Sequence, residues 1–135
     1  MTAKEYLGRL KQIDRRVEML TERAERARAR LVRVTSLYGS TPGGGHGDWT
    51  DALAGLIDEE DSLAEQLRLL ADERARILRA IEAVPDEQMR TLLQYRYVDL
   101  RTQEKTAEIM HCDIRTVQRW EQRAIAQIRV PEENK

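Results

Sequence analysis

Apolar side chains recur along residues 6–38 at alternating steps of three and four, after one opening step of four. This spacing places them on one side of a helix and is typical of a coiled-coil seam. Thr2 is placed to cap the helix, with Glu5 at the capping-box position. The pattern predicts one amphipathic helix, roughly 50 Å long at 1.5 Å per residue. Its seam residues are Tyr6, Leu10, Ile13, Val17, Leu20, Ala24, Ala27, Leu31, Val34 and Tyr38.

The stretch 39–48 ends this helix, because it holds five glycines and a proline in ten residues. Glycine costs about 1 kcal/mol and proline about 3 kcal/mol inside a helix, so we expect a flexible loop that reverses the chain. A second helix starts near Trp49 to Asp51 and ends before Pro85. Glu60 and Arg74 interrupt its seam. The remaining seam positions are Leu53, Leu56, Leu63, Leu67, Leu70, Ile77, Ile81 and Val84.

The charges of the two predicted helices are opposite. Residues 1–38 hold ten basic and five acidic side chains, whereas residues 49–84 hold four and nine. The sequence therefore predicts a long antiparallel coiled-coil hairpin over residues 1–84, with charges that select orientation more than they add stability. Small Ala24 and Ala27 leave room for Glu60, with Arg28 or Arg30 as its partner. Further apolar residues widen the apolar face, and a two-helix hairpin buries little by itself, so we expect a homodimer. Those further residues are Leu7, Leu37, Ile57, Leu69 and Leu78.

Composition supports an all-α fold. Charged residues make up 35% of the chain and aromatic residues 4%, with no phenylalanine, and alternating strand patterns are absent. Such a composition suits long amphipathic helices. Cys112 is the only cysteine, so no intrachain disulfide is possible, which fits a reducing cytosol. We see no signal peptide or membrane-spanning stretch and expect a cytoplasmic protein.

Residues 86–130 follow a different pattern, that of three shorter helices, and residues 131–135 form a tail. Asp86 is placed to cap a helix from Glu87 to about Val98. A break at 99–101 precedes Thr102, which caps a helix that ends at Met110. After a turn at 111–113, Asp113 caps the last helix, over residues 114–129.

The second and third of these helices have the spacing of a helix-turn-helix. Ala107 lies where two crossing helices need a small side chain. His111 occupies the turn position usually taken by glycine, and histidine tolerates a positive φ better than most residues. Thr106 replaces the aliphatic residue often found before the alanine. The apolar anchors of the turn are Met110, Cys112, Val117 and Trp120.

The outer face of the last helix carries arginine and glutamine. Arginine binds guanine bidentately and glutamine binds adenine, so these side chains predict contacts with DNA. Thr102 and Gln103, at the start of the preceding helix, are expected to contact phosphates, as is Arg123 further along. The candidate DNA-binding residues are Thr102, Gln103, Arg115, Thr116, Gln118, Arg119, Gln122 and Arg123.

The segment 96–128, R-Y-V-D-L-R-T-Q-E-K-T-A-E-I-M-H-C-D-I-R-T-V-Q-R-W-E-Q-R-A-I-A-Q-I, resembles region 4 of bacterial sigma factors. Thr102, Ala107, the R-T-V step at 115–117 and the R-A pair at 123–124 carry the match. Region 2 of a sigma factor, which melts promoter DNA, has no counterpart here. We therefore do not expect a complete sigma factor.

Over nearly its full length the chain is similar to a family encoded in phages and prophages of Gram-positive bacteria. The match rests on A-K-E-Y-L at 3–7, P-G-G at 42–44 and L-L-Q-Y-R-Y-V at 92–98. The resemblance implies a helical hairpin, a sigma-like helix-turn-helix and a role in phage transcription control in the bacterial host cytosol. RNA polymerase is then an expected protein partner.

Two other functions fit the same pattern. Small-terminase-like DNA packaging factors also join a helix-turn-helix to a helical oligomerisation segment. The second alternative is a protein-interaction module that does not bind DNA, and the net charge of the chain, only −1, keeps this alternative open. An enzyme is not expected. His46 and His111 lack partners at metal-ligand spacing, and the glycines of 43–47 lack the lysine of a phosphate-binding loop. No cofactor is implied.

Overall fold

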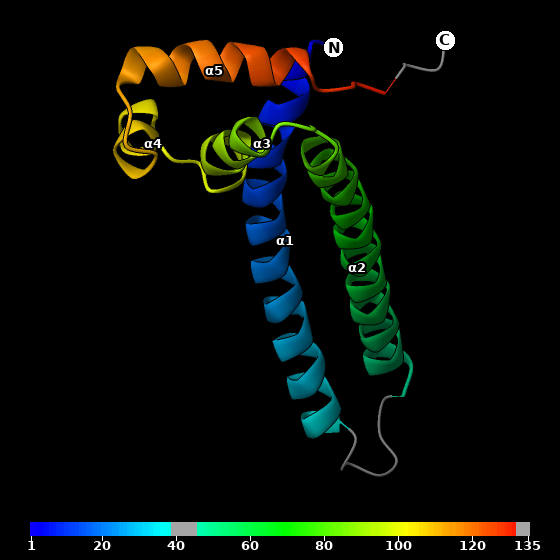
Figure 1. The fold of residues 1–135 in the computed structure, drawn as a ribbon. Coiled ribbons are helices and arrows are strands. Elements are labelled where there is room, and N and C mark those ends of the chain that lie inside the picture. Colours follow the sequence, from blue (N-terminus) through cyan, green and yellow to red (C-terminus); the bar gives the residue numbers. More distant parts are fainter. Residues whose placement is uncertain (39–45, 132–135) are drawn as a thin grey trace. The chain divides into compact units, whose positions relative to one another are not determined.

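The computed structural model describes residues 1–38 and 46–131, and within these ranges every secondary-structure element is a helix (Figure 1). Two long helices, α1 (Ala3–Tyr38) and α2 (His46–Glu82), form an antiparallel hairpin. Three short helices follow, α3 (Glu87–Leu93), α4 (Gln103–Ile109) and α5 (Ile114–Ala126), and a π-helical turn, η1 (Gln94–Val98), joins α3 to α4. The predicted all-α class, with a hairpin and a small helix-turn-helix, is confirmed. None of the helices in the described ranges is long and apolar enough to cross a membrane.

Contacts divide the chain into two compact units, which we describe separately. The hairpin unit is Arg15–Ala71, and the helix-turn-helix unit combines Met1–Asp14 with Asp72–Lys135. The sequence had suggested a boundary at residues 84–86. In the structure the first turns of α1 and the last turns of α2 group with the short helices.

The hairpin unit is held by the predicted seam. Leu20, Ala27 and Leu63 are buried, and Met19, Ala24, Leu67 and Leu70 pack against them. Glu60 pairs with Arg28 at 3.7 Å, one of its two predicted partners, and Arg30 pairs with Glu59 at 3.6 Å. These exposed pairs fix the antiparallel register and contribute little to stability.

In the helix-turn-helix unit the first turns of α1 and the last turns of α2 contribute buried apolar residues, among them Leu10 and Ile77. Leu7, which the sequence pattern placed off the main seam, is fully buried. Arg9 forms a two-pronged salt bridge with Glu73, and Arg74 pairs with Asp14. A smaller cluster joins the short helices, where Leu92, Ala107 and Val117 are buried against Met110, Cys112 and Trp120.

Three helix boundaries differ from the sequence prediction. The second helix begins at His46, earlier than Trp49; the rest of the expected loop, 39–45, lies outside the described residues, as does 132–135 of the tail. The third helix, expected to continue to about Val98, becomes η1 after Leu93. The last helix, expected over 114–129, ends at Ala126, with Gln127 as its C-cap.

We expect Leu92→Ala to lower the free energy of unfolding by about 2–5 kcal/mol, since Leu92 is fully buried where three short helices meet. Denaturant unfolding followed by circular dichroism measures this change. Leu100→Ala is the matched control, because Leu100 lies in the same unit with 44% of its surface exposed. Equal losses in the two variants would contradict the assignment of Leu92 to this core.

Candidate nucleic-acid interface

Short-range hydrogen bonds fix both ends of the turn between α4 and α5. The side chain of Thr102 accepts from the Lys105 N–H at 3.1 Å, and that of Asp113 accepts from the Thr116 N–H at 2.8 Å. Both predicted caps are confirmed. The hydroxyl and backbone N–H of Thr116 lower the pKa of Asp113, which therefore stays ionised as the cap of α5.

His111 has a φ of 56°, the positive value that its place in the turn required. The Cys112 N–H donates to the Ala107 carbonyl at 3.0 Å, and the His111 N–H donates to the Glu108 carbonyl at 3.3 Å. These two bonds are the pattern of a Schellman motif, with histidine where glycine is usual. The turn thus satisfies the last carbonyls of α4 and starts α5 in a fixed direction.

The inner face of α5 is buried, and one of its positions holds a charged side chain. Val117 and Ala124 are fully buried, and Glu121 between them is 6% exposed. Nε of Arg96 in η1 donates to the Glu121 carboxylate, and Nη1 of Arg96 donates to the Arg101 carbonyl. This ion pair ties the middle of α5 to η1.

Tyr97 lies in the same buried region. Burial, and secondarily the negative charge of Glu121, raises the pKa of Tyr97 to about 12. The Tyr97 hydroxyl is buried without a hydrogen-bond partner among the described residues. The hydroxyl therefore stays protonated beside the Arg96–Glu121 pair at neutral pH.

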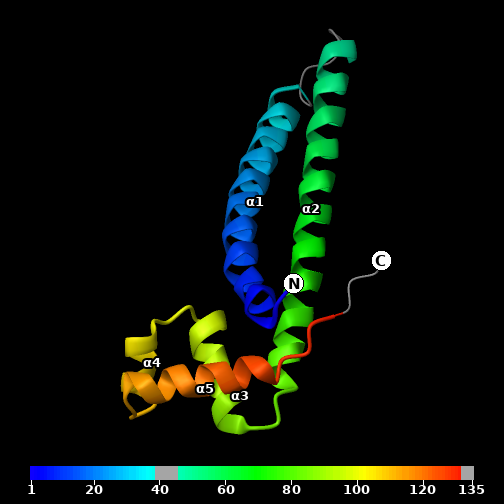
Figure 2. The ribbon, with the colours of Figure 1, turned by 90° about the horizontal axis from the view of Figure 1, so that it is seen from above.

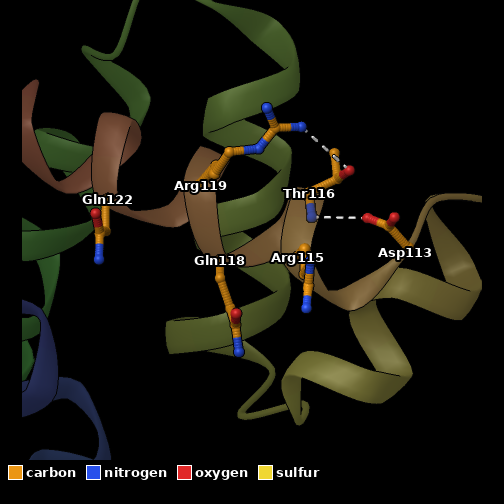
Figure 3. A pocket seen from close by; sticks show the side chains of 6 residues that line it. All are labelled: Asp113, Arg115, Thr116, Gln118, Arg119 and Gln122. Atoms are coloured by element: carbon orange, nitrogen blue, oxygen red, sulfur yellow. Dashed lines mark hydrogen bonds between the residues drawn. The ribbon is translucent and has the colours of Figure 1, made fainter.

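The outer face of α5 holds most of the predicted site residues. Arg115, Thr116, Gln118, Arg119 and Gln122 line one shallow hollow together with Asp113 (Figure 3). In this view the side chains of Arg115, Gln118 and Gln122 extend in one direction from the outer face of the helix, whereas that of Arg119 extends toward Thr116. The guanidinium of Arg119 has only a long contact, 3.5 Å, to the Thr116 hydroxyl. Arginine and glutamine donors are therefore concentrated on one solvent-facing surface.

The other predicted site residues lie around this hollow. Gln103 of α4 accepts a 3.2 Å hydrogen bond from the Gln118 side chain, so the two helices meet at this pair. Thr102 is exposed, and its hydroxyl already serves as the cap of α4. Arg123 is exposed on α5 but does not line the hollow.

Two residues near this surface were not singled out in the sequence. Lys4, in the first turn of α1, lines a second hollow with Gln103, Gln118, Glu121, Gln122 and Ile125. No sequence signal links Lys4 to residues about a hundred positions away. The structural role of Glu121 had a signal, because it shares the inward spacing of Val117 and Ala124.

No family model matches this chain, and neither a curated protein nor a solved structure does. In the described ranges no group of three or more histidine, cysteine or carboxylate side chains lies close enough to hold a metal ion. The functional argument therefore rests on the geometry of α4 and α5.

We expect Glu121→Ala to lower the free energy of unfolding by about 2–3 kcal/mol, because it leaves Arg96 without its partner in a largely buried position. Denaturant unfolding measures the loss. The double variant Arg96→Leu with Glu121→Leu should recover part of it, since neither charge is then left unpaired. A Glu121→Ala protein as stable as the wild type would contradict a structural role for the pair.

Proposed function

We propose that the chain binds double-stranded DNA with the outer face of α5 and acts as a transcription regulator. The observation on which this rests is the exposure of Arg115, Gln118, Arg119 and Gln122 along one side of a helix whose other side is buried. A helix of this width fits the major groove of B-DNA, where arginine and glutamine hydrogen-bond base edges.

The immobility of α5 within its unit supports base contacts. Its start is capped by Asp113, its middle is tied to η1 through Glu121, and Ala124 is fully buried near its end. Because the backbone of such a helix is already held in place, binding has to order only the side chains, which lowers the entropy cost of contact. Contacts near the N-terminal half of α5 would then distinguish sequences, whereas Arg123 would contact phosphates.

The resemblance of residues 96–128 to sigma region 4, and of the chain to a phage family, suggests which genes are controlled. A phage-encoded regulator would act on phage promoters in the host. RNA polymerase is the proposed protein partner, since sigma region 4 domains also bind polymerase.

We expect Arg115→Ala with Arg119→Ala to weaken specific DNA binding by about 1–3 kcal/mol for each lost base contact. Fragments of the gene's own neighbourhood, titrated by fluorescence anisotropy with competitor DNA, provide the measurement. The double variant Arg76→Ala with Arg79→Ala is the control, because both arginines are exposed on α2 in the same unit. Unchanged binding in the α5 variant would exclude this face as the interface, and salt-insensitive or absent binding of the wild type would favour a protein-interaction module.

The hairpin unit supports a second element of the proposal, a homodimer. Its buried core is small, and one side between α1 and α2 has a hollow where Ala24, Ala64 and Leu67 lie among the polar side chains of Thr21, Glu25, Arg28 and Glu60. In this unit α1 has seven arginines and three glutamates over 15–38, whereas α2 has six acidic residues and one arginine over 50–71. A second copy packed antiparallel would place each basic helix beside an acidic one and bury the hollow in a four-helix bundle.

We expect Ala64→Arg to raise the dissociation constant of the dimer about tenfold or more, since its long side chain would fill the hollow that the second copy is proposed to cover. Sedimentation velocity over a concentration series measures the assembly state. Ala29→Arg is the control, because Ala29 is exposed on the side of α1 away from the seam. A monomeric wild type would reject the dimer, and a ring of many copies would favour a DNA packaging factor.

A further inference from the structure

The second hollow, on the flank of α5 that faces α4, is lined by no basic side chain from α4 or α5, and Arg115 lies outside it toward the start of α5. Gln118, Glu121, Gln122 and Ile125 follow helical steps of three and four, so they share this flank. The nearest residue of α4 in the same hollow is Gln103, which is also uncharged. DNA held against α5 would have phosphates on both borders of the groove, and the other border has Arg123.

Lys4 supplies the missing charge from the other end of the chain. It lines the hollow together with Gln118 and Gln122, and Figures 1 and 2 both place the first turns of α1 beside the C-terminal end of α5. All these residues belong to the helix-turn-helix unit. Lys4 is exposed and forms no ion pair with any residue that the structure describes. Its ammonium group is thus available to a ligand.

We propose that Lys4 contacts a DNA backbone phosphate at the flank of α5 formed by Gln118 and Gln122, so that α1 is part of the DNA interface. This inference rests on the proposed DNA binding by α5. The amide groups of Gln118 and Gln122 and the ammonium of Lys4 can all donate hydrogen bonds to a phosphate. The carboxylate of Glu121 also lines the hollow, but its charge is balanced by the ion pair with Arg96. The Gln103–Gln118 hydrogen bond holds one of these amides in place.

The loss of a phosphate contact and the loss of a base contact have different effects on DNA affinity and on its salt dependence. A phosphate contact contributes equally on every sequence, and it releases bound counterions, so its removal lowers the salt dependence of binding. Lys4→Ala should weaken binding to a preferred fragment and to a short mixed-sequence duplex by the same factor. The slope of log affinity against log salt should fall by about 0.9 on both duplexes.

The test compares Lys4→Ala, Lys4→Arg and Lys11→Ala with the wild type, by fluorescence anisotropy on the two duplexes over a range of salt concentrations. Lys11 is an exposed lysine on the same helix that does not line the hollow, so its variant should keep the wild-type slope. Lys4→Arg keeps the charge and should also keep the slope. Circular dichroism checks that all variants retain their helices.

The outcomes separate this inference from the proposed function. If Lys4→Ala binds with the affinity and slope of the wild type while the Arg115/Arg119 variant loses binding, α5 contacts DNA and Lys4 does not. A weakening of Lys4→Ala on the preferred fragment alone would make Lys4 a base contact and overturn the phosphate assignment. If the wild type binds neither duplex at low salt, both the inference and the proposed function are wrong.

Discussion

The close approach of α4 and α5 at Ala107 is the constraint on which the candidate interface depends. Ala107 is buried against Leu92 and Val117, and a larger side chain would separate the helices that these residues join. The Schellman turn then sets the direction of α5, and the Asp113 cap sets its first residue. With start and direction fixed, helical spacing alone decides which side chains of α5 face solvent.

The sequence predicted those features whose physics is short-range. Helix caps form at Thr2, Asp86, Thr102 and Asp113, each with a backbone amide two or three residues away. Donor and acceptor are therefore close in sequence, and a few neighbouring residues are enough to predict each cap. The positive φ of His111 follows in the same way from its place in the turn. The hairpin was predictable for a different reason, because each repeat of a long heptad pattern indicates the same apolar face of the helix.

The features that the sequence did not predict depend on contacts between distant segments. The π-helical turn places Arg96 against Glu121, which lies twenty-five residues further along the chain. The inward spacing of Glu121 signals a structural role but does not identify its partner, and an unpaired glutamate there would be destabilising. Lys4 is a similar case, because only the packing of α1 within the helix-turn-helix unit brings it to the flank of α5.

The net charge of −1 is therefore a poor guide to binding, since the charges are segregated. In the hairpin unit acidic and basic side chains pair across helices, as Arg28–Glu60 and Arg30–Glu59 do. Arg115 and Arg119 on the outer face of α5 form no ion pair with a described residue, although their charges contribute to the lowered pKa of Asp113 in the same hollow. A phosphate backbone would experience the local potential within about a Debye length, roughly 8–10 Å at physiological salt. The distribution of charge around α5, rather than the net charge of the chain, therefore decides whether DNA is attracted. For the same reason the ammonium group of Lys4 in α1 contributes to the attraction at that surface.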